Sequence, residues 1–199
     1  MISSAKQFVF VHTPKTAGTS MTNVLSKYCE GIRGNGDQMH NGWPTKHWLL
    51  DGYYQNFGNI DSYYKFTVVR NPWDRMVSYY FWLNKEFDEK KFSNMLKKAR
   101  HQGHADACNF SDSSPVDYNF SSCTQYCCDV RKINNFIKFE NLEEGWKKAC
   151  EDIGIPYEEL GWANKSKQKR NYRDFYNEDT KLAVERAYAD DIDNFEYEF

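Results

Sequence analysis

The sequence predicts an α/β fold in which a parallel β-sheet is flanked by helices on both faces. Short β-rich segments alternate along the chain with segments whose apolar residues recur at helical spacing. Twice, such a segment passes through a tight turn directly into a helix-like stretch, which is the first half of a β-α-β unit. The 199 residues contain no internal repeat, and they predict one domain, residues 1–199, with a core that needs no metal or disulfide.

The first strand is predicted over residues 7–12 (QFVFVH), followed by a helix over about residues 19–28. The apolar face of this helix consists of Met21, Val24, Leu25 and Tyr28. Residues 31–45 are rich in glycine and are predicted as loop. A short helix is expected from Lys46 to about Gln55.

Residues 63–82 (YYKFTVVRNPWDRMVSYYFW) repeat the pattern of strand, turn and helix, with the strand over Lys65–Val69. Asn71 and Pro72 are typical of an N-cap and a first helical position, and Asp74 falls in the first turn. The buried stripe of this helix is predicted to be Met76, Val77, Tyr80 and Leu83.

The remainder predicts a basic surface helix, a third strand and two further helices. The basic helix covers residues 87–100, and the strand covers residues 135–139 (NFIKF). Asn141 is expected to cap a helix over residues 141–153, with Glu144 closing a capping box. The last helix starts after Asn177 and has Val184, Ala187, Tyr188 and Ile192 at helical spacing.

Residues 101–128 are predicted as an irregular, cysteine-rich insertion. Cys29 and Cys150 lie in helix-like segments, where a cysteine is typically a small buried apolar residue. The other four of the six cysteines fall in the insertion: Cys108, Cys123, Cys127 and Cys128. Their spacing relative to His101 and His104 matches no standard zinc finger or knuckle. Free thiols are favoured there, and a disulfide or zinc site remains open.

Bulk properties restrict the classes of partner. A net charge of −2 and a pI near 6.2 argue against a general nucleic-acid binder, so an anion site must be local. No segment has the roughly 20 apolar residues of a membrane helix, and Met1–Gln7 is too short for a signal peptide. We expect a cytoplasmic chain, or the catalytic part of a longer protein whose anchor is absent.

The loop HTPKTAGTS, residues 12–20, follows the first strand. A strand that enters a helix through a glycine-containing turn directs backbone N–H groups and the positive end of the helix dipole toward one point, which favours phosphate or sulfate. Lys15 adds a cation, and Gly18 allows close backbone approach. Hydroxyl groups come from Thr16, Thr19 and Ser20. The loop is P-loop-like, but it lacks the Walker A pattern, and an ordinary turn with an exposed lysine is the alternative.

Arg70 ends the second strand, and Ser78 lies two turns along the helix that Asn71 caps. Neighbouring parallel strands end at the same edge of a sheet, so Arg70 and Ser78 are expected to face the first loop across a crevice. Such an arrangement suits a ligand with two separated phosphate-like groups. The alternatives are an ion pair between Arg70 and Asp74, and a solvent-facing hydroxyl for Ser78.

These segments resemble the nucleotide motifs of sulfotransferases that use 3′-phosphoadenosine 5′-phosphosulfate (PAPS). HTPKTAGTS resembles their 5′-phosphosulfate loop, and FTVVRNPWDRMVSYY resembles their 3′-phosphate motif. FIKFENLEEGW and the C-terminal YRDFYNEDTKLAVERAYADDIDNFEYEF resemble the carbohydrate (family 2) branch. The resemblance spans nearly the whole chain except residues 31–45 and 101–130. It implies an enzyme that transfers a sulfuryl group from PAPS to a hydroxyl acceptor, expected to be a carbohydrate, and releases PAP.

The resemblance also implies roles for individual residues. Lys15 would contact the oxygen that bridges phosphate and sulfate. The 5′-phosphate would be held, largely by backbone amides, at Thr16, Ala17, Gly18, Thr19 and Ser20. Arg70 and Ser78 would bind the 3′-phosphate. In the basic segment NKSKQKRNYR, Lys167 and Arg170 are candidates for covering the nucleotide, unless this segment is an ordinary solvated charge run.

Sulfuryl transfer needs a base for the acceptor proton but requires no metal to explain it. His47 lies between the two nucleotide motifs, where related carbohydrate sulfotransferases place a catalytic histidine. We therefore expect His47 to be the base, with His40 and Asp51 as alternatives. His12 is expected to shape the loop, and residues 101–128 to form a lid or an acceptor wall.

Other functions remain open at this point. A tyrosine or small-molecule sulfotransferase would share the fold, and a non-catalytic nucleotide-binding module would need neither Lys15 nor a base. A nucleotide kinase predicts a Walker A loop, which is absent. The acidic pI weighs against a highly sulfated acceptor, and the 17% aromatic content suits a neutral sugar ring. No nucleic-acid or membrane partner is expected, and the sequence leaves the oligomeric state open.

Overall fold

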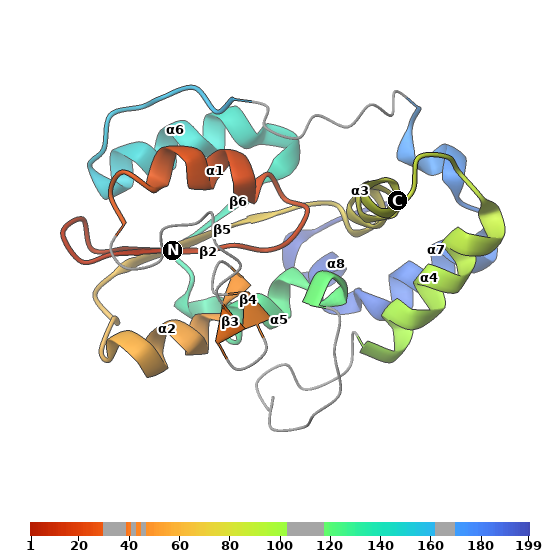
Figure 1. Cartoon of the computed structure of the whole chain (residues 1–199), viewed down its shortest axis with the longest axis horizontal. Helices are drawn as coiled ribbons and strands as arrows, with labels where there is room; N and C mark the ends of the chain where they lie inside the picture. The colour runs from red at the N-terminus through yellow and green to blue at the C-terminus, as the bar shows by residue number, and fades with distance from the viewer. Residues whose placement is uncertain (30–38, 41–42, 45–46, 103–117, 162–169) are drawn as a thin grey trace. The chain divides into compact units, whose positions relative to one another are not determined.

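The computed structural model describes residues 1–29, 39–40, 43–44, 47–102, 118–161 and 170–199 (Figure 1). The chain forms two compact units. Unit 1 comprises Met1–Val69 and Tyr126–Asn164, and unit 2 comprises Arg70–Gln125 and Lys165–Phe199. The assignment of residues 1–199 to a single domain stays a prediction.

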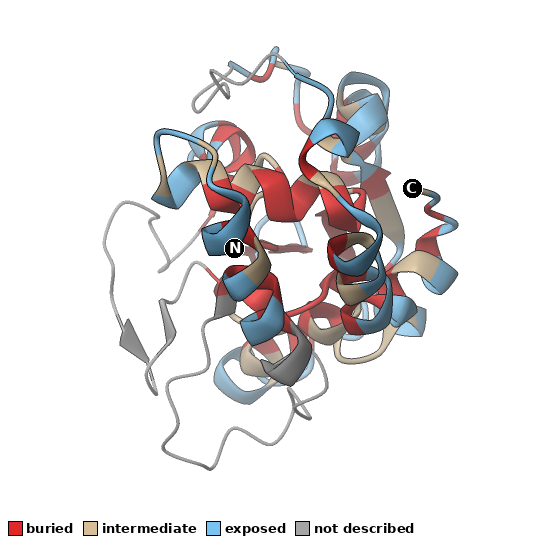
Figure 2. Cartoon of the chain, turned by 90° about the vertical axis from the view of Figure 1, so that its right-hand side faces the viewer, coloured by how far each residue is buried: buried red, intermediate tan, exposed pale blue. Residues whose placement is uncertain are grey.

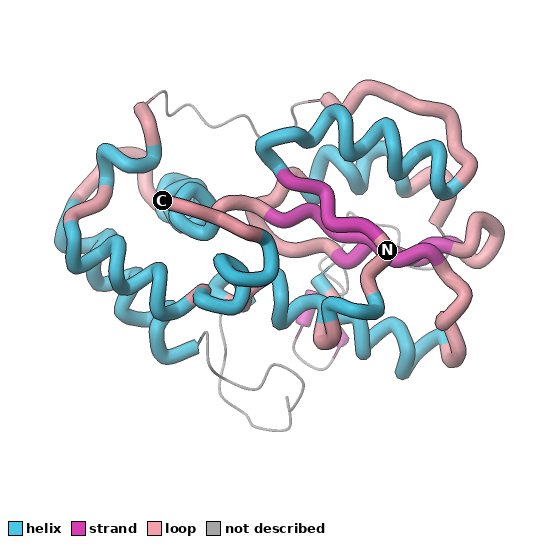
Figure 3. The backbone as a smooth tube through the Cα atoms, turned by 180° about the vertical axis from the view of Figure 1, so that it is seen from behind, coloured by secondary structure: helices cyan, strands magenta, loops and turns pink. Residues whose placement is uncertain are grey.

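Unit 1 is built on a four-stranded sheet in the order β1-β2-β5-β6 (Figure 3). The three predicted strands are confirmed and run parallel: β2 (Phe8–Val11), β5 (Tyr64–Val69) and β6 (Asn135–Lys138). The antiparallel edge strand β1 (Ile2–Ser3) was not predicted, because two residues show no periodicity. Val11 pairs with Thr67, so the chain leaves β2 and β5 at the same edge of the sheet.

Alternation along the strands explains why both faces of the sheet are covered. Phe8 and Phe10 pack in the core beneath α1 (Gly18–Leu25) and α6 (Leu142–Ile153). Val9 and Val11 point to the opposite face and pack with residues of α2 (Leu50–Phe57). Figure 1 shows α1 and α6 on one side of the sheet and α2 on the other. The α/β prediction is therefore confirmed.

Unit 2 is helical and has an aromatic core. Its helices include α3 (Pro72–Leu83), α4 (Glu89–Gln102), α7 (Glu178–Ala187) and α8 (Ala189–Phe195), and each carries a buried stripe and an exposed face (Figure 2). The buried aromatic side chains of this core are Trp73, Tyr79, Tyr80, Phe92, Phe120, Phe175 and Tyr188. Part of the high aromatic content thus serves packing rather than ligand binding.

Several predicted boundaries are wrong, and each has a local reason. Leu83 is 53% exposed because α3 ends there. α2 begins at Leu50 rather than at Lys46, which leaves His47 on the approach to the helix. Asn141 makes no side-chain cap, since the chain enters α6 through a 3-10 turn, and the predicted capping box is absent. The predicted last helix breaks at Tyr188 into α7 and α8.

Regular structure also occurs where loop was predicted. A short helix α5 (Cys123–Cys127) lies within the segment that we expected to be irregular. Two short strands, β3 (Met39–His40) and β4 (Trp43–Pro44), pair antiparallel within the predicted loop 31–45. Further 3-10 turns cover Tyr118–Phe120, Val130–Lys132, Phe139–Asn141 and Tyr172–Phe175.

No disulfide joins any two of the five described cysteines, Cys29, Cys123, Cys127, Cys128 and Cys150, and Cys108 lies outside the described residues. Burial raises the pKa of Cys123 far above neutral pH and that of Cys150 to about 11, so both thiols stay protonated. In the described part of the chain, no three His, Cys, Asp or Glu side chains gather as a metal site requires. Over the same residues, no helix has the length and apolar character needed to cross a membrane.

Candidate functional site

The first turn of α1 has no side-chain cap. The N-cap residue, Ala17, has no side chain that could accept from the helix N–H groups, and the first turn contains no acidic residue. The first N–H groups of any helix lack partners within the helix, and the helix dipole favours negative charge at that end. The geometry at the start of α1 therefore fits a phosphate or sulfate group.

The loop that leads into α1 has a strained backbone. Lys15 has a φ of 66° and Ala17 a φ of 65°, both in the left-handed region. For residues with a Cβ this conformation costs roughly 1–2 kcal/mol each, and it persists only where the surroundings enforce it. Strain of this kind is common at ligand-binding loops, where it aims backbone amides at one point.

Hydrogen bonds of three threonines anchor the strained loop to the sheet. The Thr16 hydroxyl donates to the Thr13 carbonyl at 2.8 Å. The hydroxyls of Thr13 and Thr67 lie 3.3 Å apart, and Thr67 in turn donates to the Val11 carbonyl at 2.7 Å. All three threonines are fully buried. The loop is thus tied to β2 and β5 rather than left to solvent.

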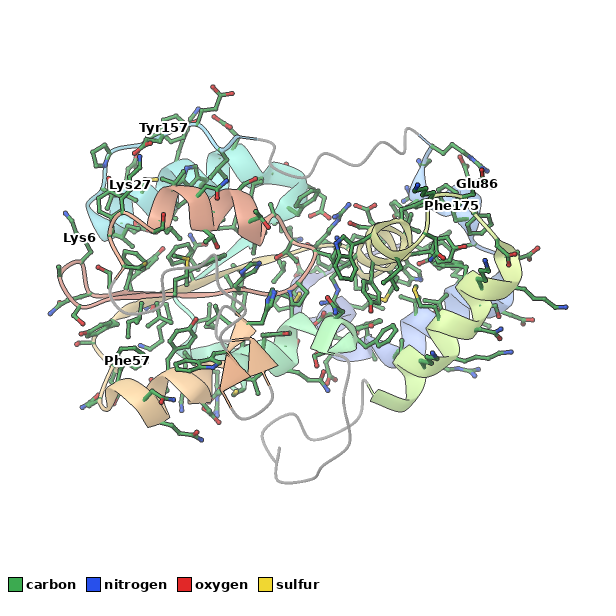
Figure 4. The ribbon with its side chains drawn as sticks, viewed as in Figure 1. Lys6, Lys27, Phe57, Glu86, Tyr157 and Phe175 are labelled. Carbon is green, nitrogen blue, oxygen red and sulfur yellow. The ribbon has the colours of Figure 1, made fainter. Side chains whose placement is uncertain are left out.

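Ser20 links α1 to the segment that follows α6. Its hydroxyl donates to the Gly161 carbonyl at 2.6 Å. Lys27 and Glu158 form an ion pair on the same side of unit 1, where Lys27 and the neighbouring Tyr157 are labelled in Figure 4. Lys167, a predicted nucleotide ligand, follows Gly161 by six residues and lies outside the described residues.

His47 lies against His12 at the end of β2. Nδ1 of His47 is 3.0 Å from the main-chain carbonyl oxygen of His12, and the two ring centroids are 4.3 Å apart. Both side chains are buried. A carbonyl oxygen only accepts, so Nδ1 of a neutral His47 carries the hydrogen and Nε2 carries the lone pair. The neutral ring therefore has the tautomer in which Nε2 can accept a proton.

Gly18 leaves room for the imidazole of His12. A Cβ at position 18 would lie 1.7 Å from Nε2 and 1.9 Å from Cδ2 of His12, distances that no side chain can tolerate. From the sequence, Gly18 was expected to allow close approach of an anion, and His12 was expected to shape the loop. Contact between His12 and Gly18 fits the second expectation. The contact with His47 was missed, because 35 residues separate the two histidines and no periodicity relates them.

Arg70 and Ser78 belong to unit 2. Arg70 forms an ion pair with Asp74, which was the alternative expected for this residue. Its Nε and Nη2 both lie 2.8 Å from Oδ2 of Asp74. Ser78 is half-buried on α3, one turn beyond Asp74.

The remaining candidates divide between described and undescribed residues. Arg170 is exposed, lies 3.8 Å from the Asp174 carboxylate and stacks over the Phe175 ring. Asp51 falls in the first turn of α2 and is half-buried. His40 lies in β3 and His101 lies in α4, but the side chains of both are outside the described residues. His104 lies entirely outside them.

Residues 1–198 match the model of the sulfotransferase family. An uncharacterized protein of Archaeoglobus fulgidus is similar to this chain, with 32% identity over 115 residues that make up 57% of this chain and 86% of that protein. No solved structure matches the chain. Since the family match runs almost from end to end, the chain belongs to the sulfotransferase family.

Proposed function

We propose that this chain transfers a sulfuryl group from PAPS to a hydroxyl group of a carbohydrate. Family membership supports sulfuryl transfer in general. The observation that carries the finer proposal is the uncapped, strained start of α1, against which the His12 ring packs. His12 in turn contacts the buried His47, whose Nε2 can accept a proton.

The start of α1 fits the 5′-phosphosulfate end of the donor. Backbone amides of Ala17, Gly18, Thr19 and Ser20 would bind the phosphate. Because the hydroxyls of Thr16 and Ser20 already donate to main-chain carbonyls, we assign the phosphate contacts to amides rather than to these hydroxyls. Lys15 is half-buried and would place its ammonium beside the bridging oxygen.

The reaction exchanges one sulfur–oxygen bond for another. The bond between sulfur and the bridging oxygen breaks, and a bond to the acceptor oxygen forms, giving a sulfate ester and PAP. Charge builds on the departing phosphate oxygen, as it does in loose phosphoryl transfer, and Lys15 would neutralise it. The acceptor proton would pass to Nε2 of His47, which is held in the accepting tautomer by the His12 carbonyl.

The 3′-phosphate would bind Arg70 and Ser78, with a bidentate contact from the guanidinium. Asp74 holds the Arg70 side chain in one orientation through two contacts of 2.8 Å. Lys167 is proposed to cover the nucleotide, as the resemblance of the basic segment implies. Arg170 is proposed for the same role.

A carbohydrate acceptor is the part of the proposal that depends most on resemblance. It is supported by FIKFENLEEGW and by the C-terminal segment, which resemble the carbohydrate branch of the family. A tyrosine-containing peptide is the acceptor that would replace it. The two differ in chemistry, because a phenol loses its proton far more readily than a sugar hydroxyl.

The test is transfer of labelled sulfate from PAPS to desulfated heparin, chondroitin, a neutral galactose-containing oligosaccharide and a tyrosine peptide. Lys15→Ala and His47→Ala should each lower kcat by roughly 100-fold or more, while PAP binding measured by calorimetry stays within about tenfold of wild type. Lys6→Ala is the matched control, because the Lys6 ammonium lies at the surface, where it donates to the Gly154 carbonyl at 2.7 Å.

Each alternative gives a distinct result. Labelling of the peptide alone would replace the carbohydrate acceptor. PAP binding without transfer to any probe would indicate a non-catalytic nucleotide-binding module. Failure of the wild-type protein to bind PAP would remove PAPS as the donor, and a fully active His47→Ala variant would remove His47 as the base.

A further inference from the structure

We propose that His12 is a positioning residue that holds the catalytic base in register with the anion-binding start of α1. The inference rests on the proposed function, since it takes His47 as the base and the first turn of α1 as the phosphate site. It assigns His12 no contact with either substrate. Its role is to connect two groups that must keep a fixed separation during the transfer.

His12 contacts the base in two ways. Its carbonyl oxygen lies 3.0 Å from Nδ1 of His47, and its ring centroid lies 4.3 Å from that of His47. The His12 ring also stacks on Phe10, with centroids 5.8 Å apart and planes 21° apart. Only 5% of His12 is exposed, so the ring has little freedom to move away from these neighbours.

The same ring lies directly against the start of α1. A Cβ on Gly18 would meet three of its atoms at 1.7, 1.9 and 2.5 Å. The backbone of Gly18 does not require glycine, because its φ is not in the left-handed region. Alanine in a helix is ordinarily more favourable than glycine by roughly 0.5–1 kcal/mol. The His12 ring therefore explains why position 18 has no side chain.

These contacts make one rigid connection. Any side chain at position 18 must push the His12 ring, and the ring then displaces His47 because their surfaces already touch. A displacement of about 1 Å between reacting groups can lower turnover by roughly 100-fold. Displacing the base leaves the phosphate-binding amides in place, so turnover should suffer much more than nucleotide affinity.

The test is a double-variant cycle of Gly18→Ala and His12→Asn. Asparagine is shorter than histidine and leaves space for the alanine methyl group, while the main-chain carbonyl that binds His47 remains. Gly18→Ala alone should lower kcat by roughly 100-fold, and His12→Asn alone by roughly tenfold. The double variant should recover at least about tenfold over Gly18→Ala, with PAP affinity within about tenfold of wild type throughout.

Gly52→Ala is the matched control for adding a methyl group to a helix of unit 1. Its Cβ would lie 3.4 Å from the nearest atom, the Cβ of Trp48, which is an ordinary contact. This variant should keep wild-type kcat and melting temperature. Melting curves of all variants separate loss of turnover from loss of folding, and if Gly18→Ala does not fold, the double variant should restore both folding and turnover.

The proposal fails if His12→Asn gives no recovery in the Gly18→Ala background, or if Gly18→Ala retains wild-type kcat. It also fails if Gly18→Ala weakens PAP binding as strongly as it lowers kcat, since Gly18 would then act only through the phosphate. Loss of the proposed function looks different: wild-type protein would neither bind PAP nor transfer sulfate, while the melting curves would still show the steric coupling of His12 and Gly18.

Discussion

Two strand–turn–helix segments of this chain look alike in sequence and differ at the start of the helix. After β5, α3 begins with Pro72, and the Asn71 side chain accepts from the N–H groups of Trp73 and Asp74 at 3.1 and 3.4 Å. After β2, α1 begins behind Ala17, which provides no cap. We call the start of α3 closed, because the Asn71 side chain caps it, and the start of α1 open, because it has no such cap.

The charges at the two helix starts also differ, and they too favour an anion at α1 rather than at α3. α3 has Asp74 in its first turn, where it complements the helix dipole and pairs with Arg70. α1 has no acid in its first turn and follows Lys15 through a strained loop. A closed start stabilises the helix by itself, whereas an open start leaves that stabilisation to a bound anion. We therefore regard the first turn of α1 as the phosphate site and the first turn of α3 as a support for Arg70.

The largest expected effect comes from closing the open start with a charge. Thr19 is exposed in the first turn of α1, and Thr19→Asp places a carboxylate where the 5′-phosphate is proposed to bind. At a separation of about 5 Å and an effective dielectric constant of about 20, repulsion per charge is about 3 kcal/mol, so PAP affinity should fall by roughly 100-fold. Calorimetry with PAP measures this loss.

Thr19→Asn is the neutral control and should bind PAP within about threefold of wild type. The carboxylate of the Thr19→Asp variant should raise the free energy of unfolding of the unliganded protein by about 0.3–1 kcal/mol, because it complements the helix dipole. Opposite signs for binding and stability are the distinctive result. If Thr19→Asp bound PAP normally, the anion site would have to lie elsewhere.

Removal of Arg70 tests whether the closed start of α3 supports binding of the 3′-phosphate. Hydrogen bonds to charged groups contribute about 1.5–3 kcal/mol, so Arg70→Ala should weaken PAP binding by roughly 10- to 100-fold. Adenosine 5′-phosphate lacks the 3′-phosphate, and its affinity should change little in this variant. The ratio of the dissociation constants for PAP and adenosine 5′-phosphate is measured for wild type and variant. It isolates the contribution of the 3′-phosphate to binding. An equal loss for both nucleotides would remove Arg70 from the 3′-phosphate site.

Asn71→Ala should open the closed start and lower stability. The substitution removes the cap of α3 and also the hydrogen bond from the Asn71 amide to the Glu198 carbonyl at 2.8 Å. Loss of an N-cap costs about 1–2 kcal/mol, which for a chain of this size lowers Tm by about 2–8 °C. Denaturant unfolding measures the difference. Asn171→Ala, at the exposed 3-10 turn 172–175, is the control and should have a smaller effect.

Sequence periodicity predicted the sheet and most helices, because each element depends on local spacing of apolar residues. The sequence also predicted the cap of α3, from the types of Asn71 and Pro72, which act on neighbouring residues. It failed for the α6 capping box and for the break at Tyr188, where the path of the chain overrides a local pattern. Elements of two residues, such as β1, left no signal.

The site could be predicted only as a set of residues. Lys15, Gly18 and His47 were proposed from the loop pattern and from resemblance, and their roles stay predictions, but the structural reason for Gly18 was not foreseen. That reason is the His12 ring, which packs against Gly18. The left-handed backbone at Lys15 and Ala17 was not predicted either. Composition and spacing carry no information on a positive φ at a residue other than glycine, so the strain became visible only in the structure.

Ala17→Gly should have the smallest effect and the opposite sign from Asn71→Ala. Ala17 has a φ of 65° and a ψ of 14°, and glycine adopts this conformation without a steric penalty. Relief of the strain, less the entropy that glycine adds to the unfolded chain, should raise the free energy of unfolding by about 0.5–1 kcal/mol. PAP binding should be retained, because the backbone amide remains. A destabilised Ala17→Gly variant would mean that the start of α1 is not strained, and the contrast between the two helix starts would then rest on the missing cap and missing acid alone.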